Sequence, residues 1–220
     1  MLQPTPHSSL HSNGHVTSSP PPTTRDAILD AAGTLLGRFG YHKTTMDDLA
    51  REAGIARRTL YLHFRSKDDI FLERIDRVVA RLLEELRAIA TSALPADERL
   101  KRMLMTRVMF RFDTVRGYTQ CLDEIFQSLR QPYLQRREGY FTAEAAVFAR
   151  VLEDGVANGD LVASDIQETA RALITATSAL MPYALSPKEL GSRREVERIT
   201  GRIADLAVAG LRKPGTRSGI

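Results

Sequence analysis

The chain has 220 residues, of which 43% are hydrophobic and 26% charged, as is ordinary for a soluble globular protein with a substantial core. Its single cysteine excludes a disulfide framework and a multi-cysteine zinc site, and no uncharged apolar stretch approaches the length of about 18 residues expected of a membrane span. The 31 Lys and Arg residues exceed the 27 Asp and Glu residues slightly, which permits an anionic partner without identifying one.

Residues 1–22 are predicted to form a disordered arm. No Asp, Glu, Lys or Arg precedes Arg25, and five of the ten prolines lie in this stretch. Such a segment buries too little apolar surface to offset the entropy lost on ordering. It also lacks the basic start and the apolar stretch of a secretory signal, so we expect a cytoplasmic protein. A second disordered segment is expected at residues 214–220.

The rest of the chain is predicted to be helical throughout, because no run alternates apolar and polar residues for long enough to indicate a strand. Helix starts are marked by a hydroxyl that can cap the first turn and, three residues later, by an acid or amide that can reach back. Pro95 and Pro132 suit the first turns of two more helices. The capping pairs are Thr23 with Asp26, Thr45 with Asp48, Ser66 with Asp69, Ser164 with Gln167, and Ser192 with Glu195.

The amino-terminal part of the helical region predicts a helix-turn-helix. A first helix covers residues 25–39, with Phe39 on its buried stripe, and Gly40 ends it. A second helix begins after Thr45, and a third covers residues 57–64 after a short turn that contains glycine. In such a motif the second of two short helices enters the major groove of DNA.

The composition of residues 57–64 favours this use. Between Ala53 and Lys67 lie four basic side chains and no acid. An arginine near the start of such a helix can pair with the O6 and N7 atoms of guanine, and a threonine at a helix N-terminus suits a phosphate. A plain helical hairpin with a solvated basic face is the alternative. The basic residues are Arg57, Arg58, Arg65 and Lys67.

Thr24–Leu83 resembles the DNA-binding domain of the TetR family of bacterial transcription regulators. The resemblance lies in the segments FGYHKTTMDDLAREAGI, TLYLHF and SKDDIF and extends over about sixty residues without a gap. It implies a homodimeric repressor that leaves DNA when a small molecule binds the carboxy-terminal domain. Ala56 departs from the family, which more often has serine there, so we expect no side-chain cap or phosphate contact at this position. The resemblance implies phosphate contacts from Thr44, Thr45, Tyr61 and Lys67, and base readout by Arg57, Arg58 and Thr59 with His63 at the edge.

The predicted architecture is therefore an all-α chain with a three-helix DNA-binding domain at residues 23–83 and a larger helical ligand-binding and dimerisation domain at 84–213. The two are joined by a long helix from Ser66 to about Ala90, whose apolar stripe spans roughly 38 Å at 1.5 Å per residue. In the family this helix pivots when ligand binds.

Two later helices are predicted to form the dimer interface. Their apolar and small residues recur every three or four positions, which allows close packing of two helices against their symmetry mates. The alternative is that both pack into their own core, and the resemblance favours the dimer. The expected interface residues are Ile166, Ala170, Leu173, Thr177, Leu180, Val196, Ile199, Ile203, Leu206 and Gly210.

The middle of the carboxy-terminal region is predicted to line an effector pocket. Methionines and aromatics at helical spacing are individually ordinary core residues, but as a set they favour a large apolar cavity. Arg107, Arg111 and Arg116 lie nearby and could attract an anionic group, although solvated faces are the favoured interpretation. The expected pocket residues are Met105, Met109, Phe112, Tyr118, Cys121, Phe126, Tyr140 and Phe148.

No catalytic, metal-binding or dinucleotide-binding motif is present in the sequence. We therefore expect no enzyme activity, cofactor or metal. The resemblance to the TetR family implies instead a transcription repressor whose homodimer binds a palindromic DNA operator and is released by a small apolar or amphipathic effector. Two alternatives stay open: a nonspecific architectural DNA-binding protein of the same fold, and a helical enzyme with a vestigial DNA-binding end.

Overall fold

The computed structural model describes residues 23–116, 122–180 and 191–213. Both terminal segments predicted to be disordered, 1–22 and 214–220, lie outside the described residues, as do Tyr118 and Cys121. The described part is all-α, as predicted, and its only β feature is an isolated bridge between Leu161 and Arg212. None of its helices is long and apolar enough to cross a membrane. The helices are α1 (Thr24–Lys43), α2 (Met46–Glu52), α3 (Arg57–His63), α4 (Lys67–Ala90), α5 (Ala96–Val115), α6 (Leu122–Ala157), α7 (Ile166–Ser178) and α8 (Arg193–Leu211).

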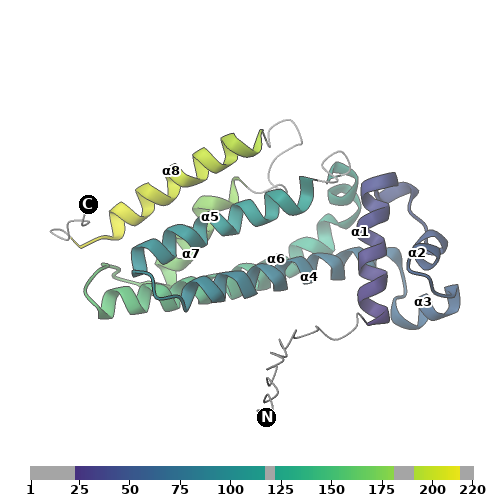
Figure 1. The fold of residues 1–220 in the computed structure, drawn as a ribbon, viewed down its shortest axis with the longest axis horizontal. Coiled ribbons are helices and arrows are strands. Elements are labelled where there is room, and N and C mark those ends of the chain that lie inside the picture. The colour runs from purple at the N-terminus through teal and green to yellow at the C-terminus, as the bar shows by residue number, and fades with distance from the viewer. Residues whose placement is uncertain (1–22, 117–121, 181–190, 214–220) are drawn as a thin grey trace, which may run out of the picture.

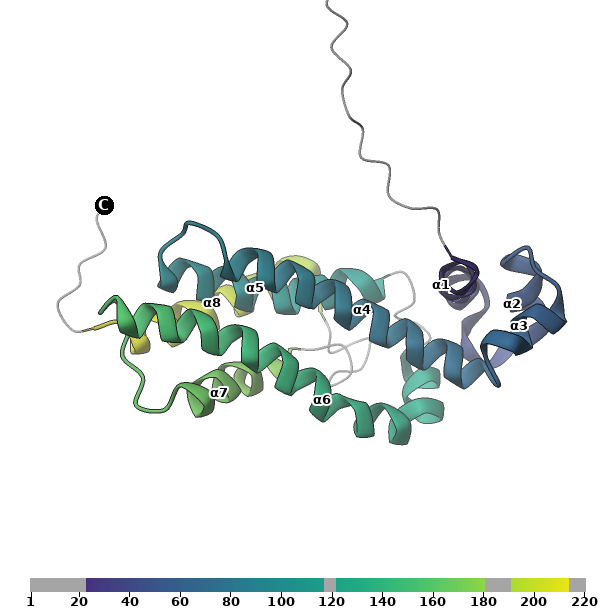
Figure 2. The ribbon, with the colours of Figure 1, turned by 90° about the horizontal axis from the view of Figure 1, so that it is seen from below.

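The three helices α1, α2 and α3 lie together at one end of an elongated molecule (Figure 1). From there α4 runs into a body built of α5, α6, α7 and α8, and α6 lies alongside α4 for much of its length (Figure 2). Within the body, α5 packs mainly against α8 and α4, and α7 packs mainly against α6.

Helix starts follow the predicted caps with one exception. Thr23 and Thr45 form complete capping boxes, and the hydroxyls of Ser66 and Ser192 accept hydrogen bonds from the amides three residues later. The predicted cap at Ser164 is wrong by one position. Asp165 caps α7 instead, and its carboxylate accepts from the amide of Glu168, because a carboxylate is as good an N-cap acceptor as a hydroxyl.

Two further helix predictions are corrected. Pro132 does not open a helix but lies inside α6, which continues through it with one backbone donor fewer. Phe39 is 53% exposed and does not belong to the buried stripe of α1. The reason is Gly40, whose φ of 79° breaks the helical path so that Tyr41 enters the core in its place.

The amino-terminal core is not confined to the helices of its own end. Buried residues of α1 to α4, among them Ile28, Leu49 and Leu60, pack together with three residues of α6. The domain boundary expected after residue 83 falls within the uninterrupted helix α4. The amino-terminal unit is thus packed onto α6 as well as continuous with α4. The α6 residues in this core are Ile125, Leu129 and Tyr133.

A second core fills the body between α4 and α8. It is aliphatic and aromatic, and its centre is provided by side chains such as Leu86, Leu100, Phe148 and Leu152, all fully buried. A smaller cluster of Val108, Met109, Phe112 and Val196 lies between α5 and α8. The body is therefore a packed helical bundle in which α6 contributes to the largest core as well as to the amino-terminal one.

Candidate nucleic-acid interface and effector site

Helix α3 is held by two apolar side chains and presents polar ones. Leu60 is fully buried and Phe64, just after the helix, nearly so. The turn from α2 passes through Gly54, whose φ of 67° favours glycine. Arg58 is exposed, as are Arg57 and Tyr61, whereas Thr59 and His63 are half-buried. The structure thus brings the predicted base-reading residues onto one short helix at the end of the molecule.

Arg57 is oriented by its neighbours. Its guanidinium lies 5.6 Å from the centre of the Tyr61 ring, and its Nη1 donates to Asp47 of α2 at 3.0 Å. The hydrogen bond with Tyr61 and the charge of Asp47 raise the pKa of Arg57 above its usual value. Arg57 therefore stays charged and is pre-positioned beside Tyr61.

The two threonines predicted to contact phosphate differ in position. Thr45 is exposed at the start of α2, where its hydroxyl donates to the Asp48 carboxylate at 2.6 Å and accepts from the Asp48 amide at 3.2 Å. Thr44 is only 1% exposed, and its hydroxyl donates to the Gly40 carbonyl at 2.7 Å. A phosphate contact from the Thr44 side chain would require that inward bond to break.

Lys67 ties the start of α4 to the end of α1. Its ammonium donates to the carbonyls of Tyr41 and Thr44, at 3.0 and 3.3 Å, and lies 4.4 Å from the centre of the Tyr41 ring. The Tyr41 hydroxyl in turn donates to Asp68, and burial together with this carboxylate raises the pKa of Tyr41. The predicted phosphate contact of Lys67 therefore competes with bonds that hold α1 and α4 together.

Arg25 positions α3 and was missed by the sequence interpretation. Its guanidinium pairs with Glu73 of α4, lies 4.4 Å from the centre of the Phe64 ring, and donates to the His63 carbonyl at 3.3 Å. It thereby holds the end of α3. Its signal in the sequence is weak because the partner Glu73 is 48 positions away.

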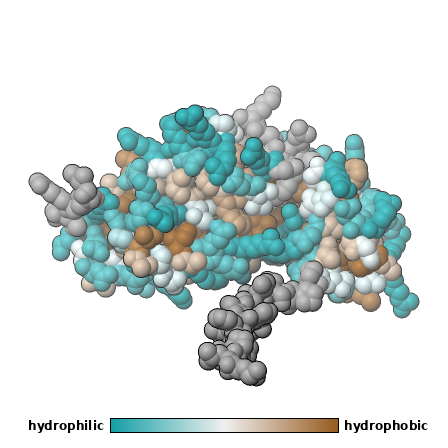
Figure 3. All heavy atoms as spheres, in the orientation of Figure 1, coloured by the Kyte–Doolittle hydropathy of each residue, from teal (hydrophilic) through white to brown (hydrophobic). Residues whose placement is uncertain are grey.

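Leu62 was also missed. It is 78% exposed, the highest value among the large hydrophobic residues of the described chain, and it lies on α3 one helical turn after Arg58. Figure 3 shows hydrophobic surface at this end of the molecule. Exposed apolar side chains on such a helix can contact the methyl group of thymine.

The described residues among those predicted for the pocket are divided among three parts of the structure. Met109 and Phe112 belong to the small cluster between α5 and α8, Met105 packs against that cluster, and Phe148 lies in the main core. Tyr140 packs beside the amino-terminal core, and its hydroxyl donates to Asp76 of α4. Tyr118, Cys121 and the side chain of Phe126 lie outside the described residues.

A hollow of about 100 Å³ does occur between α6 and α7. Its walls combine aromatic, aliphatic and charged groups, and none of the predicted pocket residues whose side chains the structure describes contributes to it. Among the described residues no three potential metal ligands come together. The hollow is lined by Glu138, Phe141, Thr142, Arg171, Ile174 and Thr175.

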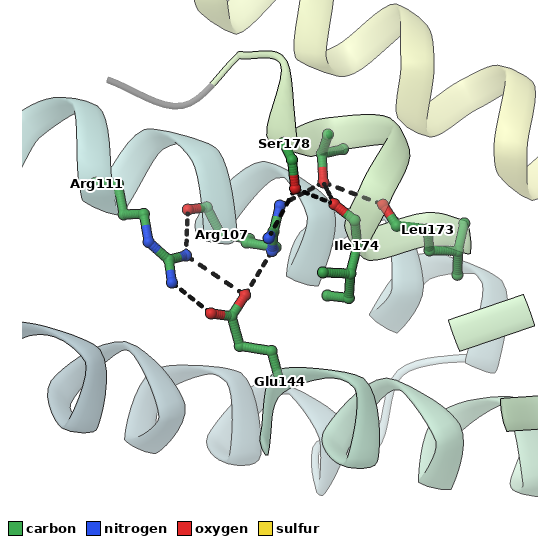
Figure 4. A network of polar contacts seen from close by, with 7 residues as sticks. Arg107, Arg111, Glu144, Leu173, Ile174 and Ser178 are labelled. Atoms are coloured by element: carbon green, nitrogen blue, oxygen red, sulfur yellow. Dashed lines mark hydrogen bonds and ion pairs between the residues drawn. The ribbon is translucent and has the colours of Figure 1, made fainter. Parts of the chain in front are cut away.

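Beside this hollow lies a buried ionic network (Figure 4). Arg107 of α5 donates through Nε to the Glu144 carboxylate of α6 at 2.5 Å, and Arg111 pairs with the other oxygen of the same carboxylate. Arg107 also donates to the hydroxyls of Thr177 and Ser178 in α7, at 2.7 and 3.4 Å. The network joins three helices.

Arg107, Arg111 and Arg116 were all expected to lie on solvated faces. Arg116 is exposed, but Arg107 and Arg111 are only 0% and 7% exposed, so for these two the expectation is wrong. The cause is Glu144, which is fully buried and was not singled out from the sequence. A signal existed: Glu144 lies on the same helical stripe as Phe141 and Phe148, so an acid was placed on an apolar face.

The residues predicted for the dimer interface divide into three sets. Ala170, Leu173, Thr177 and Val196 are buried within their own chain. Leu206 is 64% exposed and Gly210 is exposed. The remaining four, Ile166, Leu180, Ile199 and Ile203, are half-buried.

Comparison with known proteins identifies the amino-terminal end. The family described as "Bacterial regulatory proteins, tetR family" matches residues 28–73. The chain is 26% identical over 161 residues to the fatty acid metabolism regulator protein of Bacillus subtilis, covering 68% of this chain and 77% of that one. It is 36% identical over 102 residues to the HTH-type transcriptional regulator EthR of Mycobacterium tuberculosis, covering 46% of each chain.

Solved structures share the fold. A transcriptional regulator from Cytophaga hutchinsonii superposes with a TM-score of 0.70 at 18% identity, covering 84% of this chain and 97% of that one. A complex of SmeT with triclosan gives a TM-score of 0.64 at 21% identity, covering 89% and 94%. The similarity of fold thus extends well beyond the matched amino-terminal domain.

Proposed function

We propose that this chain, a transcription regulator of the TetR family, is a repressor that binds a palindromic operator as a homodimer and is released by a small organic effector. The observation that carries the proposal is helix α3, seated by Leu60 and Phe64 and presenting Arg57 and Arg58 at the tip of the molecule. Two such helices related by a dimer axis would read half-sites about one DNA turn apart.

Selection of bound fragments from genomic DNA, followed by footprinting, tests the operator. We expect a protected palindrome, whereas uniform weak protection of all sequences would favour an architectural protein.

Arg57→Ala and Arg58→Ala should relax selection at guanine positions, because a bidentate arginine contributes roughly 1–3 kcal/mol of discrimination against the wrong base. Arg102→Ala, on the exposed side of α5, is the matched control. Unchanged selection in both α3 variants would contradict readout by these arginines.

The proposed dimer uses the outward faces of α7 and α8. The α8 residues Leu206 and Gly210 are exposed, and Ile199 and Ile203 on the same stripe are half-buried. An exposed apolar stripe of this kind suits an isologous four-helix contact. Leu206→Glu should convert the dimer to a monomer in light scattering after size exclusion, whereas Val162→Glu, at an exposed apolar residue outside α7 and α8, should not. A dimer unaffected by Leu206→Glu would place the interface elsewhere.

The effector is proposed to bind in the helical body. Two relatives support a small organic ligand: one is named for fatty acid metabolism, and SmeT was solved with triclosan. In this proposal residues 23–83 bind DNA and residues 84–213 bind the effector and the second subunit, with α4 and α6 connecting the two. Because operator DNA is in the cytoplasm of bacteria, that compartment is the proposed location.

A further inference from the structure

Leu62 of α3 is an apolar side chain that lies outside the core. It is 78% exposed, whereas Leu60 and Phe64, two positions before and after it, are 0% and 3% exposed and seat the helix on the amino-terminal core. Replacement of Leu62 should therefore cost the folded chain little. Single exposed leucines are common on protein surfaces. A partner for Leu62 is indicated by its surroundings and not by its exposure alone.

The periodicity of α3 places Leu62 on the same face as Arg58. An α-helix makes one turn in about 3.6 residues, so side chains four positions apart are neighbours on its surface. Arg57 and Tyr61 form the adjacent row, in which the guanidinium lies 5.6 Å from the centre of the ring. All four side chains are exposed, and α3 lies at the end of the molecule, far from α7 and α8 (Figures 1 and 2). Leu62 thus extends the surface that carries the two arginines proposed to read bases.

The charge of this surface is complementary to duplex DNA. Arg57, Arg58 and Arg65 are exposed, and residues 54–66 contain no acid. The nearby carboxylate of Asp47 is paired with Arg57 at 3.0 Å. Such a surface attracts a polyanion. A leucine within it can neither donate nor accept a hydrogen bond, so it can favour only an apolar group, and the apolar group that a base pair presents in the major groove is the C5 methyl of thymine.

We propose that Leu62 reads a thymine of the operator half-site through contact with this methyl group. One helical turn rises about 5.4 Å and successive base pairs are about 3.4 Å apart, so the thymine should lie within about two base pairs of the base read by Arg58. Burial of one methyl group improves affinity about 4-fold, and hence about 15-fold over two half-sites. The inference rests on the proposed function, since it specifies one base of the operator that the repressor is proposed to bind.

Replacement of thymine by deoxyuridine in the selected operator tests the contact, because uracil differs from thymine only by the missing methyl group. Synthetic duplexes carry deoxyuridine at each thymine of the half-site in turn, at both symmetry-related positions, and the Kd of the full-length protein is measured for each. At one position the change should weaken binding by the wild type about 15-fold. The same change should alter the affinity of Leu62→Ala less than about 2-fold, because the side chain that contacts the methyl group is already removed.

Two controls separate this contact from general effects on DNA or on folding. Leu134→Ala removes an exposed leucine of α6 and should show the same loss on deoxyuridine as the wild type. Leu62→Ala should bind the thymine operator about 15-fold or more weakly than the wild type. Its Tm should stay within about 2 °C, and its dependence of affinity on salt should be unchanged, because it alters neither the core nor a charge.

The assignment is overturned if no thymine gives a loss that depends on Leu62. A wild type that binds both operators equally, with Leu62→Ala weak on both, would mean that Leu62 contacts the sugar and not the base. An equal loss on deoxyuridine in the wild type and in Leu62→Ala would mean that another residue, or the shape of the DNA, senses the methyl group. In both cases a protected palindrome leaves the operator proposal standing. If genomic selection yields no palindrome, the operator proposal fails and the assignment of Leu62 fails with it.

Discussion

The two ends of the molecule are held together differently. The amino-terminal end combines an apolar core with polar interactions near its surface, namely the capping boxes of Thr23 and Thr45 and the ion pair of Arg25 with Glu73. The body combines an apolar core with an ionic network that is fully enclosed, centred on Glu144. Local sequence patterns specify the capping boxes of the first arrangement, whereas its ion pair and the whole network of the second depend on helices that meet only in the folded chain. We therefore expect mutations in the two regions to differ in the size of their effects.

The largest effect should come from breaking the buried network. Glu144→Ala leaves two guanidinium groups in the interior without their carboxylate, which we expect to cost about 3–5 kcal/mol of unfolding free energy in urea titrations. Glu98→Ala, which removes the surface partner of Arg102, is the matched control and should cost less than about 0.5 kcal/mol. Equal effects of the two changes would mean that the network is no more important than a surface pair.

A core truncation at the other end should be nearly as large. Leu60→Ala empties a fully buried site beneath α3, and such changes cost about 2–5 kcal/mol. DNA binding should weaken together with stability, because Leu60 seats the helix that carries Arg57 and Arg58. Leu62→Ala on the exposed side of the same helix should leave the urea midpoint nearly unchanged. If Leu60→Ala left both properties intact, α3 would not depend on this core.

Loss of a cap should have a moderate effect that depends on pH. Thr45→Ala removes the N-cap of α2, for which about 1 kcal/mol is typical. The Thr45 hydroxyl, the Thr45 amide and Arg51 lower the pKa of Asp48 below its usual 3.8 in the folded protein. The contribution of this carboxylate is therefore present above pH 3.8 and is lost as pH falls through the lower folded value. The difference in unfolding free energy between wild type and Thr45→Ala should accordingly shrink in acid. A difference that grew in acid would contradict this assignment.

The smallest expected change concerns Lys67. If its ammonium reaches a phosphate, Lys67→Ala should make the logarithmic dependence of DNA affinity on salt shallower by roughly 1 per subunit. If it serves only the carbonyls of Tyr41 and Thr44, affinity should fall with an unchanged slope. An unchanged slope would remove Lys67 from the predicted phosphate contacts, and Arg102→Ala provides the control slope.

Much of the fold could be predicted because its signals are local. The hydroxyl and acid pairs at Thr23, Thr45, Ser66 and Ser192 mark helix starts in the structure, and the short helices around Gly54 have the predicted order. Some local predictions failed. The cap predicted at Ser164 is provided by Asp165, one position later, and the positive φ of Gly40 redirects the chain after Phe39.

The interior of the body could not be predicted to the same extent. Arg107 and Glu144 are 37 positions apart, and no local pattern reveals that α5 and α6 place them in contact. Arg107 was expected on a solvated face, but it is buried together with Glu144. A charged side chain is excluded from a core only when it has no partner there. The same limit explains Arg25, whose partners Glu73 and His63 come from other helices.

The participation of α6 in both cores has a consequence for cooperativity. Ile125 and Leu129 near its start belong to the amino-terminal core, while Phe148 and Leu152 belong to the core of the body. Neither core can lose its packing without exposing one half of the same helix. We expect a single heat-absorption peak in calorimetry, with the calorimetric and van't Hoff enthalpies in agreement, so that the domains seen in the sequence unfold as one unit.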